Sequence, residues 1–467
     1  MRFLPPPLLT TAPYGNIITI STYNSLLKGD FMMKKMILLI GVLASCATPF
    51  IKSVDYWDWS NKDLQNMSFP KSFTFGVSIF EGEVKAYDHA KRYKDDIALA
   101  KEAGLTELCI ALDWKEIEPS PGVFDEEKLH YYADKCVACL RCGIEPVILF
   151  KDYNDPVWFL EMGGFEKQKN SAIFERYCLR VFKALKGKAY RFITFWNPES
   201  YAMLAYWNKS HAPYKKDMPL AMEVFKNELD AHVRVYHALK KADDENKIQI
   251  GISKHVIQLE PKHAWDKWAA GMASRLTNDP FYEFFTTGKF KVSVWLPKKW
   301  GGVSIKYKNA LAPGSIDFIG INYHCHNRMK NFKRIPFEKE LKTDIESITV
   351  YPEGLYYAIK EVSDKMAHQL NIPIIITQNG IATTDDNLRM LHNERNLYAV
   401  SQAIKHGYNV QGYYHYSLID GFAWGSYAYK FGLFSVDPKT MERTIKPGAS
   451  RFIEIAQKHK KLVHSTV

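Results

Sequence analysis

The sequence has few of the features that mark several common classes of protein. Its 467 residues include 26 glycines and 22 prolines, ordinary numbers that exclude a collagen-like or low-complexity chain. Apolar residues make up 46% of the chain and charged residues 24%, a balance that excludes a disordered protein. No glycine-rich phosphate loop and no G-x-G-x-x-G motif follows any expected strand. We therefore expect no cofactor.

Long apolar runs are almost absent as well. The one candidate, Met36–Cys46, follows the basic pair Lys34-Lys35 and is shorter than the roughly 20 residues that a membrane-spanning helix needs. A basic start, a short apolar run and small residues are typical of a secretory signal. The ending Leu43-Ala44-Ser45-Cys46 resembles a bacterial lipobox, in which the cysteine is lipidated and becomes the mature N-terminus. An internal buried helix is the alternative interpretation.

The lipobox resemblance implies an order for the N-terminal region. We expect residues 1–31 to be an upstream extension or disordered leader, residues 32–46 a lipoprotein-type signal peptide, and residues 47–68 a linker. The protein would then be exported and held at the bacterial cell envelope by lipid on Cys46.

Seven cysteines are an odd number, and six remain once Cys46 is set aside. Cys136, Cys139 and Cys142 form a C-x2-C-x2-C pattern that superficially suggests an iron–sulfur or zinc site. The surrounding stretch, 131–142, is typical of a helix, and a spacing of three places the thiols along one stripe of it. No fourth ligand follows at a suitable spacing. We expect these cysteines to pack in the core and to bind no metal.

The chain is basic and rich in aromatic residues. Its 62 Lys and Arg against 51 Asp and Glu give a net charge of +11. The charge is diffuse and no recognition motif occurs, so we expect no nucleic-acid partner. Basic stretches at 298–299, 306–308 and 458–461 are either solvated faces or surfaces for anionic partners. The 27 Tyr, 27 Phe and 11 Trp fill a large core or supply sugar-stacking faces.

Short apolar runs alternate with helical segments from Phe69 onward. Amphipathic spacing predicts helices at Lys94–Ala103, Tyr356–Met366 and Asn393–His406. Eight β-rich runs between such segments predict an α/β fold, a single (β/α)8 TIM barrel with loop insertions, over residues 69–460 with a tail at 461–467. The expected strands are Phe73–Val77, Leu108–Leu112, Pro146–Phe150, Phe192–Phe195, Ile248–Ile252, Asp317–Ile321, Pro373–Thr377 and Gly412–Ser417.

Several motifs occur in a fixed order along this region. They are Phe69–Val77, Tyr93–Leu99, Ile316–Tyr323, Tyr351–Leu355, Gly412–Trp424 and Phe431–Leu433. In sequence and order they resemble glycoside hydrolase family 1, the β-glucosidase family, across essentially all of residues 69–460. The resemblance implies a retaining mechanism, in which one glutamate attacks the anomeric carbon and a second protonates the leaving oxygen.

The two glutamates that the resemblance implies are missing. The first motif reads Thr194-Phe195-Trp196-Asn197-Pro198-Glu199, and keeping Pro198 in register places Asn197 at the acid/base position. The second reads Thr377-Gln378-Asn379-Gly380 and places Gln378 at the nucleophile position. An amide is neither a general acid at neutral pH nor a useful nucleophile. Glu199 is a candidate substitute acid, although a carboxylate there also favours the start of a helix.

Other family positions have changed in the same direction. An arginine that steadies the nucleophile corresponds to Cys109, and a glutamate before the last tryptophan to Ala423. The histidine that grips the sugar falls at Lys151 or Asp152, and the opening glutamine corresponds to Glu81. Typical glucose recognition is therefore weakened.

Part of the sugar-binding surface is retained in the resemblance. Trp424 is kept and Tyr416 replaces a tryptophan, which leaves two aromatic faces for stacking. Asn322 is kept, and strand alternation places His324 on the same face. A structural role remains the alternative for His324.

Three functions follow from these residues. The leading hypothesis is a lipid-anchored barrel that binds β-linked glycans or glycoconjugates without hydrolysing them. The second is an active retaining β-glycosidase with rebuilt catalytic groups, with a phosphorylated or otherwise anionic substrate in one form of the hypothesis. The third is a scaffold for a protein partner, as in the klotho-type extracellular domains, which resemble this family and have lost catalytic glutamates.

Overall fold

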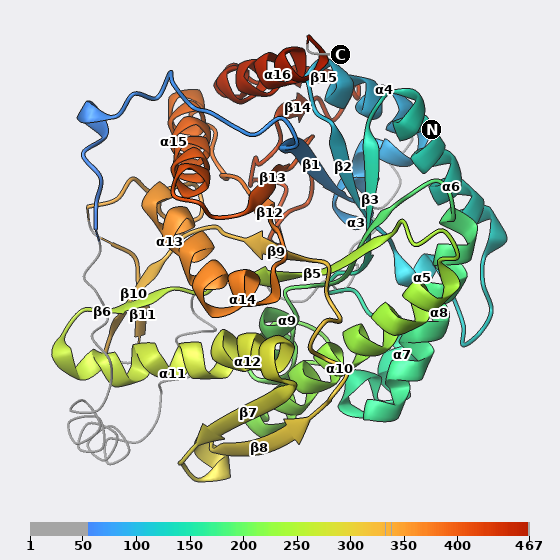
Figure 1. The fold of residues 1–467 in the computed structure, drawn as a ribbon, viewed down its shortest axis with the longest axis vertical. Coiled ribbons are helices and arrows are strands. Elements are labelled where there is room, and N and C mark those ends of the chain that lie inside the picture. The colour runs from blue at the N-terminus through green and yellow to red at the C-terminus, as the bar shows by residue number, and fades with distance from the viewer. Residues whose placement is uncertain (1–54, 332, 338, 466–467) are drawn as a thin grey trace, which may run out of the picture.

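A computed structural model describes residues 55–331, 333–337 and 339–465, and its centre is a closed barrel of eight parallel strands (Figure 1). The order around the barrel is β1-β13-β12-β9-β5-β4-β3-β2. All eight expected strands are present, so the predicted (β/α)8 fold is confirmed. Their bounds are β1 Thr74–Phe80, β2 Glu107–Ala111, β3 Glu145–Lys151, β4 Arg191–Trp196, β5 Gln249–His255, β9 Phe318–Asn322, β12 Ile374–Asn379 and β13 Val410–Tyr416.

The barrel strands are almost wholly buried because both of their faces are covered. One face packs against the surrounding helices, and the other fills the barrel interior with side chains such as Ile193, Phe318 and Tyr414. Tyr414 fits because Gly76 on the neighbouring strand has no side chain; a β-carbon there would lie 2.4 Å from the ring. The barrel is therefore a packed core, and its chemistry is confined to its ends.

Helices surround the barrel (Figure 1). The three expected helices are confirmed as parts of α4, α13 and α15, and α13 continues into a π-helical turn at Ser363–Ala367. The longer helices are α4 His89–Glu102, α6 Glu126–Arg141, α8 Ser171–Leu185, α10 Met218–Ala242, α11 Lys267–Thr277, α13 Pro352–Val362, α15 Asp386–Lys405 and α16 Ser450–His464. The shorter ones are α3 Glu81–Val84, α5 Trp114–Ile117, α7 Val157–Glu161, α9 Pro198–Tyr206, α12 Asp279–Thr287 and α14 His368–Leu370.

The cysteine pattern lies on α6, as the sequence predicts. Cys136 and Cys139 are buried against the core, and Cys142 caps the end of the helix. The six cysteines of the described residues are free thiols. Within the described part they act as small apolar side chains.

Three small sheets are inserted outside the barrel (Figure 1). One joins β6, β10 and β11, a second is the antiparallel hairpin of β7 and β8, and a third pairs β14 with β15. Their bounds are β6 Leu259–Pro261, β7 Lys289–Val294, β8 Val303–Lys308, β10 Asn327–Lys330, β11 Lys333–Ile335, β14 Phe434–Val436 and β15 Arg443–Ile445.

The register of four neighbouring strands positions the polar residues at the barrel's carboxyl-terminal end. Asn322 at the end of β9 lies beside His255 of β5 and Gln378 of β12. The backbone N–H of Asn197, directly after β4, donates to the carbonyl of Ser253 on β5 at 2.8 Å. Residues from β4, β5, β9 and β12 therefore meet at one end of the barrel.

The predicted signal peptide, its Cys46 and the leader before it lie outside the described residues. In the part of the chain that the structure describes, none of the helices combines the length and apolarity that crossing a bilayer requires.

Candidate functional site

Two amide side chains occupy the ends of β4 and β12, where the resemblance places the catalytic carboxylates. Asn197 caps α9 with a left-handed backbone (φ 51°, ψ 61°), a conformation that asparagine tolerates better than most residues. Gln378 is the penultimate residue of β12 and is buried. Neither position carries a charge.

A network of neutral hydrogen bonds fixes the orientation of Asn197. The amide of Asn322 donates to the Asn197 oxygen at 2.7 Å, and the Asn197 amide donates to the Tyr153 hydroxyl at 3.3 Å. The oxygen of Asn322 accepts from Thr377 at 2.6 Å and from Ser253 at 3.1 Å. Asn322 is fully buried, so these bonds are not exchanged for bonds to bulk water. The oxygen of Asn197, the residue that the resemblance places at the acid/base position, therefore already accepts a hydrogen bond.

His324 holds the second amide. Its Nε2 donates to Gln378 Oε1 at 3.2 Å, and its ring meets Trp424 edge-on with centroids 5.1 Å apart. Burial lowers the pKa of His324 to about 4, although the bond to Gln378 opposes the shift. The ring is therefore neutral at pH 7. Its Nδ1 makes no hydrogen bond within the described residues, which leaves an acceptor beside the aromatic wall.

This aromatic wall consists of Phe80, Trp196, Tyr416, Trp424 and Phe431. Tyr416 contacts Phe80 and Phe431 with centroids 5.8 and 4.9 Å away, and Phe80 contacts Trp196 at 5.2 Å. Tyr416 is buried in this packing, whereas Trp424 keeps part of its surface exposed. Of the two predicted stacking residues, Trp424 is the one placed to meet a ligand without rearrangement.

A carboxylate that the sequence did not single out also reaches this wall. Both oxygens of Glu83 accept from the Tyr416 hydroxyl at 2.7 Å. Burial raises the pKa of Glu83 to about 8; the bond from Tyr416 lowers it, and the nearby Asp152 carboxylate raises it. Glu83 is therefore largely protonated at pH 7, so the site holds a neutral carboxyl that can donate a proton.

The geometry of a helical turn explains why Glu83, and not Glu81, joins the group. Both belong to the single turn of α3, and residues two apart on a helix point in roughly opposite directions. Glu81 instead forms an ion pair with Lys135 of α6 and lies 3.7 Å from His89 of α4. Sequence pattern alone gave no reason to prefer the second glutamate.

Lys151 and Asp152 likewise diverge. The ammonium of Lys151 is buried between Asp155 at 3.3 Å and Glu228 at 3.4 Å, with the Tyr201 ring 3.8 Å away. Asp152 accepts from the backbone and side chain of Asn154, and burial raises its pKa. Asp152 is thus the neighbour of Glu83, while the charge of Lys151 is already neutralised.

Glu199 lies close to the site but is engaged elsewhere. One oxygen accepts from the His255 backbone N–H at 3.0 Å and from Ser200 Oγ at 3.2 Å. The other oxygen lies 3.9 Å from the ammonium of Lys254. Burial raises the pKa of Glu199, and the charge of Lys254 opposes that shift. Glu199 lies in the first turn of α9, and its carboxylate accepts from the backbone of β5.

The positions that support catalysis in the resemblance are apolar here. Cys109 lies on β2 among buried side chains that include Ala111 and Val147, and burial raises the pKa of its thiol to about 12. Ala423 is buried beside the same cluster. Cys109 therefore brings a neutral thiol to the position where the resemblance implies an arginine.

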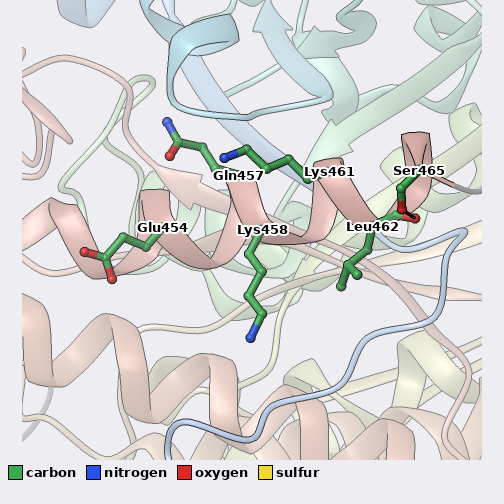
Figure 2. A pocket seen from close by; sticks show the side chains of 6 residues that line it. All are labelled: Glu454, Gln457, Lys458, Lys461, Leu462 and Ser465. Carbon is green, nitrogen blue, oxygen red and sulfur yellow. Dashed lines mark hydrogen bonds between the residues drawn. The ribbon is translucent and has the colours of Figure 1, made fainter.

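A separate surface pocket of about 350 Å³ lies on the C-terminal helix and includes part of the basic stretch 458–461 (Figure 2). Lys458 and Leu462 point to one side of α16, and Gln457 and Lys461 point to the other. The pocket shares no residue with the group at the barrel end.

A closed barrel of eight parallel strands, with polar and aromatic residues gathered at the carboxyl ends of its strands, defines a protein of the (β/α)8 class. The chain belongs to glycosyl hydrolase family 1, whose family model matches residues 77–461. It is 26% identical to beta-glucosidase A of Acetivibrio thermocellus over 79% of this chain and 87% of that protein. It is 25% identical to a 6-phospho-beta-galactosidase of Clostridium acetobutylicum, over 83% and 91% of the two chains.

Solved structures of beta-glycosidases have the same fold. A beta-glycosidase from Pyrococcus horikoshii superposes with a TM-score of 0.75 at 28% identity and covers 84% of this chain and 96% of its own. A beta-glucosidase from Thermotoga maritima in complex with castanospermine has a TM-score of 0.74 at 22% identity, with 85% and 99% covered, and supports the fold.

The raised pKa of Glu83 predicts a pH-dependent stability. Between an ordinary carboxyl pKa near 4.5 and about 8, the unfolded chain releases the Glu83 proton while the folded chain keeps it. Folding is therefore penalised as pH rises through this window. Glu83→Gln, which stays neutral, should gain stability over the wild type between pH 5 and about 8. Calorimetric unfolding at several pH values measures the gap, with the exposed Glu102→Gln as control. A gap that stays constant with pH would contradict the assignment.

Proposed function

We propose that this family 1 β-glycosidase-like protein binds β-linked glycans or glycoconjugates at the carboxyl-terminal end of its barrel and does not hydrolyse them. One observation carries the proposal. Both positions that the family uses for its carboxylates are amides, and Asn322 and His324 hold them in neutral hydrogen bonds.

The chemistry of glycoside hydrolysis gives this observation its weight. A retaining glycosidase needs two carboxyl groups about 5–5.5 Å apart, one as nucleophile and one as acid and base. Asn197 has no proton of suitable acidity to donate, and Gln378 has no oxygen that forms a stable glycosyl ester. Amide groups nevertheless donate and accept hydrogen bonds, so they can orient sugar hydroxyls.

The surrounding charges favour a neutral ligand over a phosphorylated one. The phosphorylated-substrate hypothesis relied on Lys151, but its ammonium already lies between Asp155 and Glu228. The neutral carboxyl of Glu83 offers a phosphate no positive charge, and the nearby Asp152 carboxylate would repel one. A stacked, uncharged sugar ring is the better fit.

A rebuilt enzyme is the second candidate, and the two acids at the aromatic wall favour it. Burial raises the pKa of Glu83 to about 8, so a proton donor is present at neutral pH, and burial also raises the pKa of Asp152. For Glu199 to act as the acid, its carboxylate would have to leave the His255 N–H, Ser200 and Lys254. What this candidate lacks is a group in the place of Gln378 that attacks the anomeric carbon.

Purified protein should fail to hydrolyse β-glucosides and β-galactosides, with or without a 6-phosphate. Activated aryl leaving groups need no acid, so their hydrolysis tests the nucleophile alone. Release of the aryl group should stay far below about 1 per second, the lower range of typical enzymes. The rebuilt enzyme would be established instead by wild-type turnover above that rate, if Glu199→Gln, Glu83→Gln or Asp152→Asn abolished it.

Restoring both carboxylates is the matched control for that assay. Asn197→Glu combined with Gln378→Glu should regain little activity, because Cys109 supplies no positive charge and Ala423 no sugar contact. Full activity in the double variant would mean that the rest of the site is still that of a working glycosidase.

Binding should depend on the exposed face of Trp424. Stacking on one aromatic side chain contributes about 1 kcal/mol to binding. Trp424→Ala should therefore weaken the binding of a glycoside with a millimolar-range dissociation constant by about five-fold. Titration calorimetry with a panel of β-glycosides measures this, and Trp295→Ala is a control at a tryptophan outside the barrel end. Absence of binding to every glycoside in the panel would leave the protein-scaffold hypothesis.

We also propose that the protein is exported and is anchored to a membrane by lipid on Cys46. The support is the sequence Lys34-Lys35, the apolar run that follows, and Leu43-Ala44-Ser45-Cys46. In a bacterial host, Cys46→Ser should move the protein from the membrane to the soluble fraction and leave the signal uncleaved at this cysteine. Fractionation with mass spectrometry of the N-terminus tests it. The same membrane partition in both proteins would refute the anchor.

A further inference from the structure

The β7–β8 hairpin projects from the barrel's periphery beside α12 and α10 (Figure 1). Strand alternation separates its two faces. The inner face carries Phe290 and Val292, which are buried, and the Phe290 ring packs on Phe225 of α10 with centroids 5.5 Å apart. The hairpin is therefore firmly seated, and its outer face has a fixed orientation.

The outer face of this hairpin is an array of lysines. Lys289 lies directly opposite Lys308, and Lys291 directly opposite Lys306. All four side chains are exposed. Like charges directly opposite each other on neighbouring strands destabilise a sheet. In the described part of the chain, none of these four lysines forms an ion pair, so the repulsion is not offset internally.

The connection between the strands adds two lysines and an exposed apolar tip. Lys298 and Lys299 lie in the loop, and Lys298 makes one ion pair of 3.5 Å, with Asp217. Trp295 beside them is 88% exposed, more than any other large apolar side chain among the described residues. Its indole contributes nothing to the core, which leaves its exposure unexplained by folding.

We propose that this hairpin docks on the anionic surface of a lipid bilayer. The lysines would face the lipid headgroups and Trp295 would enter the interfacial layer. Lysines near an anionic membrane each strengthen binding about five-fold, and tryptophan prefers the boundary between headgroups and acyl chains. The proposal depends on neither sugar binding nor lipid on Cys46, because it concerns a surface outside the barrel end.

The exposed tip favours a membrane over a soluble polyanion. A nucleic acid or acidic polysaccharide would neutralise the lysines along the strands equally well. It would not require a large apolar side chain at the extremity of the loop, next to Lys298 and Lys299. A bilayer surface fits both the lysines and Trp295, since its charged headgroups lie outside its apolar layer.

The test measures binding to vesicles by sedimentation, with full-length protein carrying Cys46→Ser so that no lipid anchor contributes. The wild-type hairpin should bind vesicles containing phosphatidylglycerol and not vesicles of phosphatidylcholine alone. Binding should fall steeply between about 0.1 M and 1 M salt, because the screening length shortens from about 10 to 3 Å. Brominated lipids should quench tryptophan fluorescence less in Trp295→Ser than in the parent protein.

A matched pair of variants separates this surface from the general positive charge. Lysine-to-glutamine changes on the hairpin should weaken binding by more than a hundred-fold, from about five-fold for each lysine. An equal number of such changes at exposed lysines elsewhere should weaken it far less. The hairpin set is Lys289, Lys291, Lys306 and Lys308, and the control set is Lys71, Lys94, Lys101 and Lys439.

Two results would overturn the proposal. Equal loss of binding in the hairpin and control sets would mean that net charge alone brings the protein to vesicles. Binding to soluble dextran sulfate that depends on the hairpin lysines, with no sedimentation with vesicles, would assign the hairpin to a polyanionic chain. Thermal unfolding at or above the parent temperature in both sets shows that the folds are intact, with a rise expected in the hairpin set because the opposed charges are removed.

Discussion

The buried amide of Asn322 is the interaction on which the barrel end depends. Its oxygen accepts from Thr377 and Ser253, which come from the strands on either side, and its nitrogen donates to Asn197. Three neighbouring strands are thereby connected through one side chain that water does not reach. Because a buried amide must satisfy both of its ends, this arrangement fixes which way Asn197 faces and which atom it offers to a ligand.

Carboxyl groups are still present at the barrel end, on Glu83 and Asp152. At the ends of β4 and β12, where two carboxylates act in a retaining glycosidase, the chain has neutral amides. Glu83 and Asp152 instead bring carboxyl groups from the ends of β1 and β3, and burial raises the pKa of both. Neutral amides therefore occupy the ends of β4 and β12, and the carboxyl of Glu83, with its raised pKa, lies against the Tyr416 hydroxyl.

The eight barrel strands could be predicted because each is a short apolar run between helical segments, and burial on both faces leaves that signature in the sequence. Family motifs in order placed Asn197, Gln378, Asn322, Tyr416 and Trp424 at the barrel end. The direction in which a side chain points within a local turn could not be predicted from the sequence in the same way. Glu81 and Glu83 share one helical turn, and adjacent Lys151 and Asp152 point apart, so only the structure separates them. Tyr153 was missed because its contact with Asn197 joins different loops.

The neutral side chain of Gln378 matches its neutral surroundings. A carboxylate at position 378 would lie beside the neutral ring of His324. Within the described residues Gln378 hydrogen-bonds to no cation, so ionising such a group would cost several kcal/mol, because burial removes water without supplying an opposite charge. Cys109 is buried as well, and an arginine there would also be taken out of water. A neutral amide at 378 and a neutral thiol at 109 therefore suit their buried positions, and either Gln378→Glu or Cys109→Arg alone should destabilise the fold.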